Sequence, residues 1–211
     1  MKKKFLKILI SFTLFFNILF SFNITNFNNK FLIKNNTQIV YATTIDNNTK
    51  YDSISLKYNQ LNIINEQLYM DNLEVRRSVI DEIVIHHSGG ENTTVEDINK
   101  MHSEKGWGGI GYNYYIRKDG SIYKGRDIKY VGAHCIGKNY NSIGICLEGN
   151  FEYNKPTNKQ MGSLLALTTG LSKTYDIHTI SRHKDTNSTD CPGRYFDWET
   201  FKEVYNNILK N

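Results

Sequence analysis

The chain has 211 residues, enough for one domain with additional segments. Its formal charge of +5 comes from 26 basic and 21 acidic residues, but six of the lysines and none of the acidic residues lie within residues 1–42. Residues 43–211 therefore carry a charge of about −1, and nothing in the composition points to a nucleic-acid partner.

The N-terminal stretch has the pattern of an export signal. Lysines at positions 2, 3, 4 and 7 precede an apolar run from Ile8 to Phe22 that only Ser, Thr and Asn interrupt. The run is shorter than the roughly 20 apolar residues that a membrane span needs, which favours export over a spanning anchor. We therefore predict a secreted protein with a signal peptide or leader over 1–42, ending at Ala42. Membrane contact is expected only through an uncleaved leader.

The rest of the chain divides into a linker and one domain. Residues 23 to about 53 are rich in Asn, Thr and Lys and show no sustained periodicity, so they are interpreted as the remainder of the leader and, over 43–53, a linker. Residues 54–211 form one unit without internal repeats that is long enough to bury a core.

Strands and helices alternate within this domain. Alternating or continuous apolar patterns predict strands over 81–88, 112–126 and 142–149, with a hairpin turn at Asp119-Gly120 in the second. Helices are predicted over 94–104, 157–174 and 197–209, where Thr94 and Thr157 are N-cap candidates for the first two. This order predicts an α/β fold with a mixed central β-sheet and helices packed on its faces.

Three cysteines, at 135, 146 and 191, are an odd number for an exported protein. A full disulfide framework is therefore excluded, and at least one thiol is free or bound to something else. Cys135 and Cys146 could pair and leave Cys191 alone.

The segment "SRHKDTNSTDCPG" places His183 and Cys191 in one turn-rich loop, and "IVIHHS" adds His86 and His87 on opposite faces of a strand. Each residue taken alone is more commonly structural than a ligand. Together, however, two imidazoles and one thiolate suit zinc, and three protein ligands with a fourth position left for water are the catalytic arrangement. The sequence has no Cys-x-x-Cys pair, which argues against a zinc finger.

Five sequence blocks resemble a known family. "IVIHHS", "GWGGIGYNYYIRKDGSIYKGRD", "VGAH", "NSIGICLEGN" and "RHKDTNSTDCPG", in this order and spacing, are similar to the type-2 N-acetylmuramoyl-L-alanine amidases, a group that includes phage amidase-type lysozymes and peptidoglycan recognition proteins. The resemblance covers about residues 70–200. It implies a zinc enzyme with its site in a surface groove that cuts the amide between the lactyl group of N-acetylmuramic acid and the L-alanine of the stem peptide.

The resemblance also implies roles for particular residues. One zinc per chain would be held by His86, His183 and Cys191, with His87 left as a structural residue. Tyr112 would contact the water, and Thr189 would steady the oxyanion. Candidate substrate-binding residues, by their place in the blocks, are His102, Trp107, Lys129, Tyr130, His134 and Asn141.

Two departures from the family pattern leave questions open. The anhydro-muropeptide branch has a glutamate at the position of Cys146, so this chain resembles the phage and recognition-protein branch; Glu148, on the same strand face, is a second candidate base. The Lys129-Tyr130 pair matches neither pair that recognition proteins use to sort stem peptides, which leaves the stem type undetermined.

The expected partner is bacterial peptidoglycan or a muropeptide. The protein itself is expected to be a secreted, cell-wall-associated monomer. The alternative is a non-catalytic module that binds muropeptide without cutting it. Non-catalytic members of the recognition-protein family lack the cysteine ligand, so Cys191 favours the enzyme.

Overall fold

The computed structural model describes residues 23–27, 30–34, 39–40 and 61–210. The chain divides into two units, Met1–Asp46 and Asn47–Asn211. In the first unit, β1 (Asn23–Phe27), β2 (Lys30–Lys34) and β3 (Ile39–Val40) form an antiparallel sheet that the sequence pattern does not predict. Of the predicted signal peptide or leader over 1–42, only 23–27, 30–34 and 39–40 are described; its boundary at Ala42 and the linker over 43–53 lie outside the described residues.

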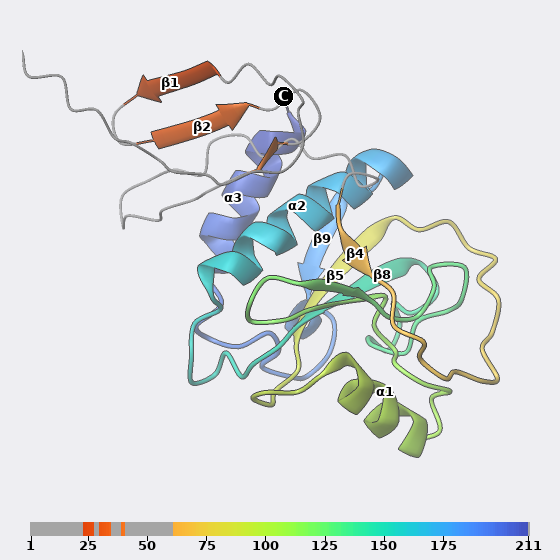
Figure 1. The fold of residues 1–211 in the computed structure, drawn as a ribbon. Coiled ribbons are helices and arrows are strands. Elements are labelled where there is room, and N and C mark those ends of the chain that lie inside the picture. Colours follow the sequence, from red (N-terminus) through yellow and green to blue (C-terminus); the bar gives the residue numbers. More distant parts are fainter. Residues whose placement is uncertain (1–22, 28–29, 35–38, 41–60, 211) are drawn as a thin grey trace, which may run out of the picture. The chain divides into compact units, whose positions relative to one another are not determined.

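The second unit is built on a six-stranded sheet in the order β4-β7-β6-β8-β5-β9 (Figure 1). All neighbouring strands are parallel except the β6–β7 hairpin. The predicted α/β fold with a mixed sheet is therefore confirmed. The strands are β4 (Ile63–Ile64), β5 (Glu82–His87), β6 (Tyr114–Ile116), β7 (Ile122–Lys124), β8 (Ser142–Leu147) and β9 (Thr179–Arg182).

Three helices begin at the caps that local sequence provides. Thr94 starts α1 (Val95–Glu104) with a capping box, in which its hydroxyl accepts from Asp97 N and the Asp97 carboxylate accepts from Thr94 N. Thr157 starts α2 (Asn158–Tyr175) in the same way with Gln160, and Asp197 caps α3 (Trp198–Leu209). These reciprocal bonds satisfy main-chain N–H groups that the first helical turn leaves without partners. The three predicted helices are confirmed to within one residue.

The helices cover the two faces of the sheet. Figure 1 shows α2 and α3 together on one side and α1 on the other. On the α1 side, Val95 and Ile98 pack against Tyr115 of β6 and Cys146 of β8. His86 of β5 is the register partner of Cys146, and partners in neighbouring strands present their side chains to the same face. His86 therefore lies on the α1 face, where it is fully buried.

The sequence pattern misses β4, β9 and the 3₁₀ turn η2 (His183–Asp185). Strand β9 pairs in parallel with β5, yet only Ile180 among its four residues is buried, so it lacks the apolar pattern that marks the other central strands. No helix in the described part of the chain has both the length and the apolar content needed to cross a membrane.

Candidate metal centre

Three side chains from two distant parts of the sequence meet at the carboxyl end of β5. The candidate ligand atoms of His86, His183 and Cys191 all lie within 4.8 Å of one another. The pairing of Ile85 with Arg182 aligns the ends of β5 and β9, so that His86 and His183 emerge at the same edge, with ring centroids 4.6 Å apart. This parallel pairing is what places the two histidines together.

Cys191 is held in this cluster by main-chain bonds on both sides. The His87 N–H donates to Cys191 Sγ at 3.3 Å, and the Lys184 N–H donates to the Cys191 carbonyl at 3.0 Å. Burial raises the pKa of the Cys191 thiol to about 12. The neighbouring His87 faces away from the cluster, where its Nδ1 accepts from Phe151 N at 3.0 Å, in keeping with a structural role.

A chain of hydrogen bonds fixes which nitrogen of His86 faces the cluster. Ser142 Oγ uses its proton to donate to the Lys138 carbonyl, so toward His134 Nε2 it can only accept. His134 then carries its proton on Nε2 and accepts on Nδ1 from His86 Nε2, 3.1 Å away. His86 Nδ1 is left with a free lone pair, 3.8 Å from Cys191 Sγ.

The position of His134 depends on a glycine. A Cβ built on Gly144 of β8 would lie 2.5 Å from the His134 ring, closer than real contacts allow. The His134 ring therefore occupies space on β8 that a side chain at position 144 would fill, and it is buried there behind His86. Burial lowers the pKa of His134 to about 3, so the ring is neutral and the proton chain holds at physiological pH.

The donor set fits zinc. Zinc bonds of about 2.0–2.1 Å to nitrogen and 2.3 Å to sulfur at a tetrahedral angle separate the two donor atoms by about 3.6 Å. The 3.8 Å between His86 Nδ1 and Cys191 Sγ matches this span. Among the described residues no fourth Asp, Glu, His or Cys joins the cluster, and His178 is exposed and pairs with Asp176 instead.

Tyr112 lies beside the cluster, whereas Thr189 shapes the loop that leads to it. The Tyr112 ring centroid is 5.0 Å from that of His86, and its hydroxyl interacts with the Cys146 thiol. Thr189 is exposed, and its Oγ1 accepts from Cys191 N at 3.2 Å. The Thr189 hydroxyl proton remains available for a ligand.

Three of the six predicted groove residues lie in three different environments. Trp107 is 43% exposed, and its ring lies tilted against the His102 ring, with the two centroids 4.7 Å apart. His102 is itself buried, and its Nδ1 accepts from Gly111 N at 2.9 Å, so it supports the turn that carries Tyr112. His134, as described above, is buried behind His86 and accepts from its Nε2.

The other groove candidates lie elsewhere. Lys129 Nζ lies 5.0 Å from the Tyr130 ring centroid, so these two side chains contact each other. Asn141 precedes β8 and donates to Asp81 at the start of β5. Because these strands are parallel, Asn141 lies at the opposite end from His86 and the structure does not bring it into the cluster.

The structure also bears on two further hypotheses from the sequence, Glu148 as a base and a Cys135–Cys146 disulfide. Glu148 is 2% exposed and its carboxylate is taken up by Arg117 Nε at 2.8 Å and Lys118 N at 3.0 Å, so it is neither a solvated carboxylate nor a free base. All three cysteines lie within the described residues, and each is free and buried. The structure therefore contains no Cys135–Cys146 disulfide.

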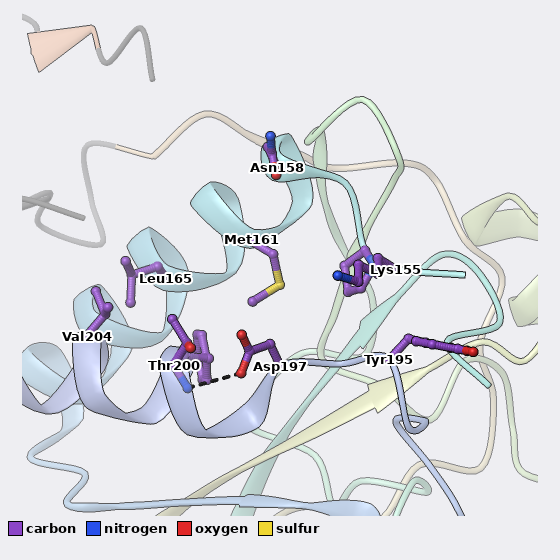
Figure 2. A pocket seen from close by; sticks show the side chains of 10 residues that line it. Lys155, Asn158, Met161, Leu165, Tyr195, Asp197, Thr200 and Val204 are labelled. Carbon is purple, nitrogen blue, oxygen red and sulfur yellow. Dashed lines mark hydrogen bonds between the residues drawn. The ribbon is translucent and has the colours of Figure 1, made fainter. Parts of the chain in front are cut away.

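A separate cavity of about 150 Å³ lies between α2 and α3. Figure 2 shows that residues of both helices and of the segments before them line it, and that Met161 of α2 faces the N-cap Asp197 and Thr200 of α3. It shares no residue with the metal cluster, so the two sites are distinct.

Several known proteins are similar to this chain. A family model described as N-acetylmuramoyl-L-alanine amidase matches residues 76–194. The endolysin of Escherichia phage T7 is 36% identical over 126 residues, which are 56% of this chain and 83% of the endolysin. Peptidoglycan-recognition protein SC2 of Drosophila melanogaster is 34% identical over 122 residues, or 52% of this chain and 66% of that protein.

A solved structure extends the similarity to the fold. The N-acetylmuramoyl-L-alanine amidase LysC from Clostridium intestinale URNW is 40% identical to this chain, with a TM-score of 0.67, and the match covers 69% of this chain and 98% of LysC. The chain therefore belongs to the N-acetylmuramoyl-L-alanine amidase family and is an enzyme of that class.

Proposed function

We propose that this protein is a secreted, zinc-dependent amidase that hydrolyses the bond between N-acetylmuramic acid and L-alanine in peptidoglycan. The observation that carries the proposal is the cluster of His86, His183 and Cys191, whose ligand atoms lie within 4.8 Å of one another in a chain of this family. The lysine-rich start and the apolar run from Ile8 to Phe22 support export to the wall.

His86, His183 and Cys191 would hold one zinc ion. When bound, zinc supplies an activated water at neutral pH and polarises the scissile carbonyl. His134 keeps the His86 lone pair turned toward the cluster through its hydrogen bond to Nε2. The main-chain bonds to Cys191 keep the sulfur in place.

The substrate would be bound and oriented by side chains around this cluster. Tyr112, next to His86, supplies a phenol that can donate to the oxyanion of the tetrahedral intermediate. Thr189 supplies a second hydroxyl from the loop before Cys191. The half-exposed Trp107 ring offers an apolar wall for the glycopeptide. Hydrolysis breaks the amide C–N bond, and the leaving L-alanine amine takes up a proton.

A non-catalytic recognition module is the competing function. Such a module must bind muropeptide, but it does not need all three metal ligands. The presence of Cys191 within 3.8 Å of His86 Nδ1 favours the enzyme, because the thiol completes a three-ligand site.

The test combines metal content with product analysis. We expect one zinc per wild-type chain by elemental analysis, and peptidoglycan digested by the wild type to release stem peptides with a new L-alanine amino terminus, detected by mass spectrometry. Cys191→Ala and His183→Ala should lose both zinc and product because each removes one ligand.

His178→Ala is the matched control, because His178 is exposed and pairs only with Asp176. It should keep wild-type zinc content and activity. Full zinc occupancy in Cys191→Ala would refute the ligand assignment, and intact peptidoglycan after treatment with zinc-loaded wild type would support the recognition module instead.

A further inference from the structure

We propose that Asn187 is a positioning residue that sets the orientation and tautomer of His183 for metal binding. The inference rests on the proposed zinc site and assigns a role to a side chain that the sequence pattern does not single out. Asn187 follows His183 by one turn of chain, and its Oδ1 lies 3.0 Å from His183 Nε2.

The hydrogen-bond network determines which end of the Asn187 amide faces His183. The other amide atom, Nδ2, lies 3.2 Å from the carbonyl oxygen of Ile136, which can only accept. The NH₂ group must therefore point to Ile136 and the oxygen to His183. Cys135 Sγ, 3.3 Å from the same Oδ1, agrees with this assignment because a thiol can donate to the oxygen.

This orientation decides the state of the His183 ring. Because Oδ1 only accepts, His183 Nε2 must carry the proton and donate it. The neutral ring then has its lone pair on Nδ1, the nitrogen left for a metal. Asn187 thus does for His183 what His134 does for His86, and the two histidines present equivalent Nδ1 lone pairs to the cluster.

His183 needs this support more than His86 does. His86 is a fully buried residue within a central strand, whereas His183 begins the short turn η2 and is only partly buried. Its ring would otherwise be free to rotate into other orientations. Asn187 is in turn fixed by its own N–H, which donates to the His183 carbonyl at 3.0 Å, and by the bond to Ile136 in the neighbouring loop.

The consequence is a link between two loops. Residues 183–191 carry two of the three candidate ligands, and the 134–137 segment carries the partner of His86. The Asn187 side chain joins these two loops through its bonds to Ile136 and Cys135. Loss of its amide should loosen His183 while leaving His86 and Cys191 in place.

Zinc affinity of the full-length protein, measured by competition with a chromophoric chelator, tests the proposal without relying on activity. Asn187→Ala should bind zinc about 10- to 100-fold more weakly than wild type, the usual effect of removing a partner of a metal-bound histidine. Asn187→Asp keeps an oxygen acceptor for Nε2–H but loses the NH₂ group that donates to Ile136, so it should bind zinc more tightly than Asn187→Ala. Ser188→Ala, in the next and exposed position, is the matched control and should be unchanged.

A second measurement reads the ring directly. Nitrogen NMR of zinc-loaded protein labelled at histidine should show His183 protonated on Nε2 in wild type and in Asn187→Asp. The inference is overturned if Asn187→Ala binds zinc as tightly as wild type, if Asn187→Asp is as weak as Asn187→Ala, or if wild-type His183 carries its proton on Nδ1. If Asn187→Ala does not fold, the NMR spectra of the wild type and of Asn187→Asp still test the proposal. A wild-type protein that fails to bind zinc would instead refute the proposed function.

Discussion

At the scale of single residues, Tyr112 is the side chain on which the proposed chemistry depends most directly. It lies against His86 but is not a ligand candidate, so its hydroxyl can act on the substrate without holding the metal. A donor that acts mainly on the transition state changes kcat rather than KM. We therefore expect Tyr112→Phe to lower kcat by about 10²- to 10³-fold with little change in KM or zinc content.

Steady-state kinetics on a soluble muropeptide, together with elemental analysis, would measure this effect. Tyr153→Phe is the matched control because its ring is 78% exposed, and it should behave as wild type. An unchanged kcat in Tyr112→Phe would remove Tyr112 from the mechanism and leave Thr189 as the remaining hydroxyl donor.

Residue types and family resemblance are enough to choose the candidate ligands, but not to describe their surroundings. The sequence predicts that His134 lies in the groove. In the structure its ring is instead buried behind His86, because Gly144 has no side chain to occupy that space. Asn141 belongs to one of the sequence blocks that resemble the family. Because β5 and β8 are parallel, however, it lies at the end of the sheet opposite His86. Such placements depend on contacts between segments distant in sequence, which a linear pattern does not record.

At the scale of secondary-structure elements, the end of β8 is tied to the β6–β7 hairpin by a buried ion pair. Glu148 accepts from Arg117 Nε and from Lys118 N, which lie just after β6. Arg117 is 31% exposed, so solvent weakens the pair but does not remove it. Glu148→Gln should lower the free energy of unfolding by about 1.5–3 kcal/mol, the range for hydrogen bonds to a charged group.

Denaturant unfolding and activity per folded molecule separate this role from catalysis. We expect the destabilised Glu148→Gln enzyme to keep its kcat. Glu152→Gln, which breaks the exposed contact with Arg194, is the control and should change stability little. A Glu148→Gln enzyme with normal stability and no activity would show that the carboxylate acts in the chemistry.

The elements that sequence predicts well are those fixed by local bonds. Thr94 and Thr157 each close a capping box within their own helix, and Asp119-Gly120 turns the hairpin between β6 and β7. Strand β9 differs because its four residues become a strand only by pairing with β5. The element that delivers His183 to the cluster is therefore one that local patterns could not predict.

At the scale of the whole molecule, the candidate site joins parts of the chain that are far apart in the sequence. Cys191 and His86 are separated by 105 positions, and their side chains meet at the carboxyl edge of a mostly parallel sheet. An unfolded chain does not keep these donor atoms together. A metal bound by this cluster should therefore stabilise the folded state over the unfolded state.

Removal of the metal should lower the melting temperature. A ligand at a free concentration about 1,000-fold above its Kd stabilises the folded state by about 4 kcal/mol, which for a protein of this size corresponds to roughly 8–16 °C. Calorimetry of the wild type with zinc and after treatment with a chelator would measure the difference. Cys191→Ala lacks one ligand and should melt at nearly the same temperature under both conditions. An equal shift in that variant would mean that zinc stabilises the protein from another place, and that the cluster at the end of β5 is not the metal site.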